Sequence, residues 1–241
     1  MKITVLGASG LIGGSVVDIL KGSGHEVVAA SRNTGADVLT GAGLADALAG
    51  ADVLVDVTNS PSFADDAVLD FFTRSSRNLV ATASDQGVGH YVALSIVGCD
   101  GLPDSGYMRA KVAQERIITG SGLPYTIVRA TQFQEFAEAI VAEMTIDGEV
   151  RAPDALIQPI AAAAVAAAVA RAAQDSPRNG VVDIGGPDTM SFADLARVVL
   201  ARQHADTPVT VSAEARYFGT TLQERSLVTG NGAELGTTRF Q

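Results

Sequence analysis

The sequence contains a single cysteine, Cys99, and only three histidines. One cysteine cannot form an intrachain disulfide, so the chain is compatible with a reducing compartment and we expect a cytoplasmic protein. The histidines (His25, His90 and His204) are isolated from one another and do not fall in the cysteine or carboxylate spacings typical of metal sites. We therefore expect no bound metal.

Basic residues and long apolar runs are also scarce. The chain has 17 Lys and Arg against 27 Asp and Glu, a formal net charge of −10, which argues against a nucleic-acid partner because phosphate binding needs a basic surface. The apolar stretch 160–170 is too short and too rich in alanine to span a bilayer, and the N-terminus does not resemble a signal peptide. We expect a small-molecule substrate as the partner, no membrane association, and either a monomer or a homodimer.

Short apolar runs alternate with segments of helical periodicity over the first 145 residues. This alternation predicts a parallel sheet with helices on both faces, and right-handed crossovers then make it doubly wound. The expected strands lie at 3–6, 27–30, 53–57, 91–96 and 125–128, with a further short strand at 37–39. The expected helices lie at 11–21, 44–49 and 63–83, with a fourth that opens near Pro103 and continues through 111–118.

The alternation loosens after about residue 145. A chain of 241 residues is long enough for one large α/β domain with a small appendage. We therefore predict a single domain over 1–241, in which residues from about 145 to 241 contribute a small substrate-side lobe over the carboxyl edge of the sheet. Residues 212–241 have few apolar anchors, and we expect them to be irregular or partly helical.

A glycine-rich segment, Gly7-Ala8-Ser9-Gly10-Leu11-Ile12-Gly13, follows the first predicted strand and opens the first predicted helix. Gly7 fits the tight turn, Gly10 the close approach of backbone to ligand, and Gly13 the packing of helix on strand. The backbone amides at such a helix start point at an anion, where the helix dipole favours negative charge. The segment therefore predicts a site for the pyrophosphate of a dinucleotide.

The end of the second strand bears on which dinucleotide binds. It reads Ala30-Ser31-Arg32 and has no acidic residue that could hold the ribose 2′-hydroxyl of NAD. Arg32 can instead pair with a 2′-phosphate, with Ser31 as a hydroxyl donor, which favours NADP(H). Asp37 nearby keeps NAD(H) open as the alternative. Asn59 follows the strand at 53–57 and either touches the cofactor or serves a turn.

Tyr107 and Lys111 lie one helical turn apart in a predicted helix, after a strand that carries Ser95 near its end. A hydride added to a carbonyl leaves an alkoxide that needs a proton, and a tyrosine can supply it if its pKa falls from about 10. An ammonium at i+4 favours the phenolate and can also hold the nicotinamide ribose. Ser95, at the carboxyl end of its strand, can hydrogen-bond the substrate oxygen. This trio is a candidate catalytic site.

Three segments together resemble a known family. They are 91–98 (YVALSIVG), 106–115 (GYMRAKVAQE) and 122–133 (GLPYTIVRATQF), and the glycine pattern of 7–13 is similar too. The chain resembles the atypical short-chain dehydrogenase/reductases, in particular their NmrA-like NAD(P)H-binding branch. The resemblance covers roughly residues 1–205 and implies a Rossmann domain that binds NADPH.

By position, the resemblance implies a set of site residues. The cofactor residues are Gly7, Ser9, Gly10, Leu11, Ile12, Arg32 and Lys111, with Thr131, Gln132 and Phe133 beside the nicotinamide, the last two facing substrate; Tyr107 and Ser95 are the acid and its helper. Active members of the family reduce small carbonyl, enone or quinone compounds, so we expect an NADP(H)-dependent oxidoreductase. A catalytically silent redox-sensing regulator and a nucleotide-sugar epimerase-like enzyme stay open as alternatives.

Overall fold

The seven strands of the central sheet are all parallel, and the computed structural model describes them together with all 241 residues of the chain. The strands, in chain order, are β1 (Lys2–Leu6), β2 (Glu26–Ala30), β3 (Val53–Asp56), β4 (His90–Ile96), β5 (Tyr125–Ala130), β9 (Gly180–Gly185) and β12 (Glu234–Leu235). Their order across the sheet is β12-β9-β5-β4-β3-β1-β2. The order reverses between β1 and β3, and such a switch point is where doubly wound sheets bind ligands.

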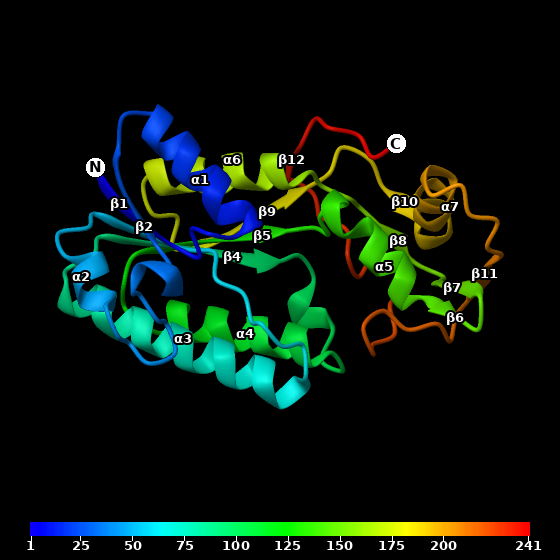
Figure 1. Cartoon of the computed structure of the whole chain (residues 1–241), viewed down its shortest axis with the longest axis horizontal. Helices are drawn as coiled ribbons and strands as arrows, with labels where there is room; N and C mark the ends of the chain where they lie inside the picture. The colour runs from blue at the N-terminus through cyan, green and yellow to red at the C-terminus, as the bar shows by residue number, and fades with distance from the viewer.

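Helices cover both faces of this sheet (Figure 1). One face carries α1 (Leu11–Gly22) and α6 (Ala162–Gln174), and the other carries α2 (Leu44–Leu48), α3 (Asp65–Asp85) and α4 (Gly106–Thr119). Each face has its own buried cluster, because side chains alternate between the two faces along a strand. The predicted Rossmann-like α/β fold with a doubly wound parallel sheet is confirmed.

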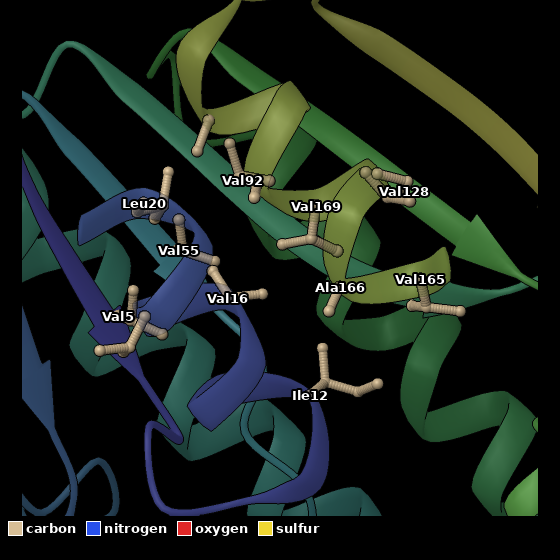
Figure 2. Packing of buried hydrophobic residues seen from close by; sticks show 14 of the residues in the cluster. Val5, Ile12, Val16, Leu20, Val55, Val92, Val128, Val165, Ala166 and Val169 are labelled. Atoms are coloured by element: carbon tan, nitrogen blue, oxygen red, sulfur yellow. The ribbon is translucent and has the colours of Figure 1, made fainter. Parts of the chain in front are cut away.

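The alanine run of the sequence forms α6, which packs against α1 and the strands beneath it. Figure 2 shows Ala166 and Val169 of α6 beside Val16 of α1, above Val55 and Val92 of the sheet. Small side chains let the two helices approach each other closely, while each fully buried valine contributes about 1.5–3 kcal/mol of hydrophobic stabilisation. This layer holds the start of α1, and with it the glycine segment, in a fixed place on the sheet.

Smaller elements gather at one end of the sheet and share a third buried cluster (Figure 1). They are α5 (Ala137–Glu143), β6 (Thr145–Ile146), β7 (Glu149–Pro153), β8 (Leu156–Ile157), β10 (Met190–Ser191), α7 (Phe192–Arg202) and β11 (Val209–Ser212). Residues beyond 145 therefore have two roles: α6, β9 and β12 complete the main sheet and its cover, and the rest build this lobe. No helix of the structure is both long enough and apolar enough to cross a membrane.

Two local expectations prove wrong. Residues 37–39 form a turn and not a strand, because the Asp37 carboxylate accepts hydrogen bonds from the backbone amides of Leu39 (2.8 Å) and Thr40 (3.3 Å). Such an Asx-type turn competes with strand pairing, so the sheet ends at β2. The helix that carries Tyr107 begins at Gly106 and not near Pro103, with the Ser105 hydroxyl accepting the Met108 amide at its N-cap.

Candidate active site

The glycine segment turns from β1 into α1 at the switch point of the sheet. Gly7 has a φ of +85°, and a Cβ there would lie 2.8 Å from the carbonyl oxygen of Val57, just after β3. A Cβ on Gly13 would overlap the Gly7 carbonyl, whereas one on Gly10 would lie 3.3 Å from it. Gly7 and Gly13 are thus required by packing of the protein itself, and Gly10 is the glycine whose outer side is open.

The first turn of α1 offers unpaired backbone amides toward that open side. Gly10 is the N-cap residue, and no side chain caps the helix. The amides of the first helical residues have no partner within a helix, so they are free for an anion. Ser9 and Leu11 are exposed around this turn, whereas the Ile12 side chain is buried in the core under α6. Only the backbone of Ile12 can therefore serve a ligand.

Arg32 and Ser31 follow β2, which lies next to β1 in the sheet. Ser31 caps the short helical turn η1 (Arg32–Thr34), and its backbone amide donates to Thr34 Oγ1 at 2.8 Å. The Arg32 side chain is exposed and forms no salt bridge, whereas the Asp37 carboxylate is held by its own turn. The Arg32 cation near the β1–α1 turn thus has no carboxylate partner in the protein, whereas one oxygen of Asp37 is occupied by its own turn.

Tyr107 lies in the first turn of α4, and its hydroxyl donates a 2.8 Å hydrogen bond to Oδ1 of Asn59. Asn59 follows β3 only two residues after the Val57 carbonyl that touches the glycine turn. The phenol, the end of β3 and the glycine segment therefore meet at one edge of the sheet. The ring of Phe63, 65% exposed, lies 5.4 Å from the Tyr107 ring.

Burial raises the pKa of Tyr107 to about 12, although the hydrogen bond to Asn59 acts in the opposite direction. The expectation that Lys111 lowers the pKa of this phenol is not met in the structure. Burial is the largest influence on this phenol, and the Phe72 ring lies beside both groups, 5.9 Å from the Tyr107 ring and 4.3 Å from the Lys111 ammonium. Tyr107 therefore stays a protonated phenol near neutral pH, which is the form that a proton donor needs.

The Lys111 side chain is only 3% exposed, and its ammonium points into the layer between α4 and the sheet. It donates to the carbonyl oxygen of Leu94 at 2.8 Å and to Oε1 of Gln114. Burial lowers the pKa of Lys111 to about 8, against the opposing effect of nearby Asp56, Glu115 and Cys99. An ammonium has three N–H donors, so one of them has no hydrogen-bond acceptor in the protein.

Ser95 does not join Tyr107 at the exposed edge. Its side chain is 3% exposed and its hydroxyl donates to Oε1 of Glu115 at 2.5 Å, on the α4 side of the sheet. Glu115 in turn accepts two hydrogen bonds from Arg129, at 2.9 and 2.6 Å. The Ser95 hydroxyl is therefore hydrogen-bonded to the ion pair that Glu115 of α4 forms with Arg129 of β5. Asn59, and not Ser95, is the polar side chain that contacts the Tyr107 hydroxyl.

The three residues after β5 have different surroundings. The Thr131 hydroxyl is buried and donates to the carbonyl of Gln158 at 2.5 Å. Gln132 is 8% exposed, and its Oε1 has no hydrogen-bond partner, which is costly for a buried acceptor. The Phe133 ring stacks on that of Phe136 at 5.5 Å. Of these three, Gln132 is the residue with unused hydrogen-bonding capacity.

Sequence reasoning missed the polar residues buried beneath Lys111. Gln114 joins Lys111 to Asp56, because its amide nitrogen donates to Asp56 Oδ2 at 3.0 Å. Two signals could have found them: Gln114 lies at i+3 from Lys111 on the same helix, and Asp56 is a lone carboxylate that ends an otherwise apolar strand. Patterns within single elements did not connect the two residues.

Cys99 is 1% exposed, and burial raises the pKa of its thiol to about 12. The thiolate is the reactive form, so the folded chain at pH 8 should react with iodoacetamide roughly 10³-fold more slowly than the unfolded chain. Mass spectrometry of time points measures this rate directly, since Cys99 is the only thiol. The same chain in concentrated guanidinium chloride is the control, and equal rates in the two states would contradict the prediction.

The structure contains no group of three or more His, Cys, Asp or Glu side chains that could hold a metal ion.

Comparison with solved structures finds the same fold in several enzymes. MoeE5, solved with UDP-glucose and NAD, is 20% identical, with a TM-score of 0.74 over 99% of this chain and 94% of that one. A dTDP-4-dehydrorhamnose reductase from Clostridium acetobutylicum is 20% identical (TM-score 0.72, 98% and 95% covered). The UDP-glucose 4-epimerase of Thermus thermophilus, solved with NAD, is 18% identical (TM-score 0.71, 94% and 92% covered). Identities this low establish the fold alone.

A search of curated protein sequences finds no match. A protein-family model, described as NAD(P)H-binding, matches residues 7–176, which include the glycine turn, Asn59, Tyr107 and Lys111. The matched region spans every strand of the main sheet from β2 to β5 and the whole of α6. With most of its length matched, and with the sheet and glycine turn described above, this chain belongs to the NAD(P)H-binding family.

Proposed function

We propose that this chain is an NADP(H)-dependent oxidoreductase that transfers hydride between the cofactor and a small carbonyl, enone or quinone compound. The observation that carries the proposal is the Tyr107 phenol. It stays protonated near neutral pH, it lies at the carboxyl edge of the sheet, and through Asn59 it adjoins the glycine turn. A proton donor beside a nicotinamide site is what reduction of a polarised double bond requires.

The residues of the glycine turn fit a dinucleotide. The unpaired amides after Gly10 suit a pyrophosphate, and the open outer side of Gly10 leaves room for it. Exposed Arg32 suits a 2′-phosphate. Beneath this edge, the third N–H of the buried Lys111 ammonium, which has no hydrogen-bond acceptor in the protein, would suit a ribose hydroxyl. These contacts support a cofactor that lies across the switch point with its nicotinamide end near Tyr107.

In the proposed reaction, the bound cofactor supplies the hydride to the substrate carbon. Tyr107 turns its hydroxyl from Asn59 Oδ1 to the substrate oxygen and transfers its proton there, so a carbonyl becomes an alcohol and the phenolate recovers its proton from solvent. Asn59 holds the phenol in place, and the Gln132 amide oxygen is an acceptor that a donor group of the substrate or cofactor can satisfy.

The test is oxidation of NADPH, followed at 340 nm, against a panel of quinones, aldehydes and enones. Turnover with at least one class supports the oxidoreductase. Tight NADPH binding without turnover on any of them would overturn it and favour the silent sensor. The same fold occurs in a UDP-glucose 4-epimerase, so the epimerase-like alternative is tested too. An epimerase would convert a nucleotide sugar without net oxidation of the cofactor.

Arg32→Ala tests the choice of cofactor. We expect the unmutated protein to bind NADPH more tightly than NADH, because a charge-assisted pair between Arg32 and the 2′-phosphate contributes about 1.5–3 kcal/mol, roughly 10- to 100-fold in Kd. The substitution should remove most of this preference and leave the Kd for NADH nearly unchanged, as measured by isothermal titration calorimetry. Arg77→Ala, another exposed arginine without a salt bridge, is the matched control. Equal Kd values for the two cofactors in the unmutated protein would refute the NADP(H) preference.

A further inference from the structure

A chain of buried polar groups runs from Lys111 to the end of β3. We call Lys111, Gln114, Asp56 and Tyr91 the Lys111 relay; each is at most 3% exposed. They come from three elements that are far apart in sequence, namely α4, β3 and β4. Burying a lysine and a carboxylate costs free energy unless each finds hydrogen-bond partners and compensating charge. The partners that these two groups have in the protein therefore indicate what holds the lysine in place.

Gln114 is the link between the two charges. Its Oε1 accepts from the Lys111 ammonium, and its Nε2 donates to Asp56 Oδ2 at 3.0 Å. Only this orientation of the amide satisfies both neighbours, because an ammonium can only donate and a carboxylate can only accept. Lys111 forms no direct salt bridge with any carboxylate. The two charges are therefore coupled through a fixed amide.

Both carboxylate oxygens of Asp56 accept hydrogen bonds from protein groups, in place of the water molecules that would surround an exposed carboxylate. Its Oδ2 accepts from the Tyr91 hydroxyl at 2.9 Å as well as from Gln114, and its Oδ1 accepts from the Thr58 amide at 3.1 Å and the Thr58 hydroxyl at 2.7 Å. No Lys or Arg side chain lies within salt-bridge distance of it. The Asp56 carboxylate thus accepts four hydrogen bonds from protein groups beneath Lys111.

The ammonium itself is fixed on three sides. Leu94 lies one residue beyond Ala93, which pairs with the last residue of β3, so its carbonyl is free to accept from Lys111. Gln114 takes a second N–H, and the face of the Phe72 ring lies 4.3 Å away. The N–H that remains has no acceptor in the protein, and its direction is set by the other contacts.

We propose that Gln114 and Asp56 are positioning residues for Lys111: Gln114 sets the direction of the free N–H, and the Asp56 carboxylate holds the Gln114 amide in that orientation and places a charge near the ammonium. The inference rests on the proposed role of Lys111 in holding a ribose of the cofactor. Neither residue is expected to touch cofactor or substrate. Both act through Lys111, and their effect should appear in its protonation.

The charges around Lys111 set the sign of the expected effects. Burial lowers the pKa of Lys111, and Asp56 is the largest opposing influence. The other titratable or charged groups that face it are Tyr91 on β4, Cys99 after β4, Glu115 on α4, and Arg129 on β5 behind Glu115, while α3 contributes the uncharged Phe72. Without the Asp56 charge, Lys111 should lose its proton at a lower pH, within the neutral range.

Lysine NMR tests this on the full chain. The sequence has only three lysines, Lys2, Lys21 and Lys111, so ¹³Cε-labelled lysine gives three signals, which Lys2→Arg and Lys21→Arg assign. We expect a titration midpoint near pH 8 for Lys111, and a midpoint lower by about 0.5–1 pH unit in Asp56→Asn, which keeps an acceptor for Gln114. Gln114→Met should also lower the Lys111 midpoint, and this variant provides the test if Asp56→Asn does not fold. Asp70→Asn removes an exposed carboxylate of α3 and should leave the midpoint unchanged.

NADPH affinity measured against pH completes the test. In the unmutated protein, binding should weaken as the pH rises through about 8, and in Asp56→Asn and Gln114→Met it should weaken from a correspondingly lower pH. If the Lys111 midpoints in Asp56→Asn and Gln114→Met equal that in Asp70→Asn, the relay is wrong, even if the protein binds cofactor. If those midpoints move but the pH dependence of NADPH binding does not, the positioning role is wrong. An unmutated protein that binds neither NADPH nor NADH would overturn the proposed function, and the positioning role with it, whatever the lysine titration gives.

Discussion

Tyr107→Phe should reduce turnover by about 10²–10⁴-fold, the usual contribution of a positioned proton donor. The Kd for NADPH should change little, because the phenol hydroxyl is not one of the groups proposed to hold the cofactor. The substitution removes one hydroxyl and the hydrogen bond to Asn59, and it keeps the ring that packs between Phe63 and Phe72. The fold should therefore survive, at a cost of about 1 kcal/mol for the lost hydrogen bond.

Steady-state kinetics on a substrate found in the panel measures this effect, and Tyr125→Phe on β5 is the matched control. Tyr125 lies at the start of its strand, the end of the sheet opposite to Tyr107, so its hydroxyl should not matter for turnover. Full activity in Tyr107→Phe would mean that another group or water supplies the proton. In the unmutated enzyme, Tyr107 should stay protonated up to about pH 12. A fall in reductive turnover as the pH rises through about 8 would therefore indicate deprotonation of Lys111 and not of Tyr107.

Gly10→Val should weaken NADPH binding by roughly 100-fold or more, since it would remove at least two of the charge-assisted hydrogen bonds that we propose for the pyrophosphate. The structure explains why the fold should tolerate it: a Cβ at Gly10 lies 3.3 Å from the Gly7 carbonyl, a tight but adjustable contact. The branched side chain then occupies the open side of the turn, where the backbone must approach the phosphates. Calorimetric titration with NADPH, on protein shown to be folded by circular dichroism, gives the Kd.

Two further glycines of the same helix start serve as comparisons. Gly14→Ala should be harmless, because its Cβ would meet only the Ala8 carbonyl at 3.7 Å. Gly13→Ala should destabilise the fold itself, because its Cβ would overlap the Gly7 carbonyl. The three substitutions thus separate loss of binding from loss of folding. Unchanged NADPH affinity in folded Gly10→Val protein would remove the cofactor site from this turn.

Patterns along the chain were enough to predict the first five strands of the sheet, the glycine turn and the spacing of Tyr107 and Lys111, but not the edge strand β12, which lies in a segment expected to be irregular or partly helical. Each of these depends on residues that are close together in the sequence. An apolar run becomes a buried strand, glycines permit the tight turn of Gly7, and a spacing of four places two residues on one helix face. Such local rules suffice to predict a doubly wound fold, and they indicate the edge of the sheet at which we expect its ligand to bind.

Which polar groups meet in the interior was settled by the packing of whole elements. Ser95 and Asn59 each follow or end a strand, yet Ser95 turns to Glu115 while Asn59 meets the Tyr107 hydroxyl. Asp56 and Gln114 are 58 positions apart and are joined only where α4 packs on the sheet. A buried polar side chain must find a partner at the place to which packing carries it, and that place depends on how the elements are layered. The residues around Lys111 were therefore beyond the reach of local sequence patterns.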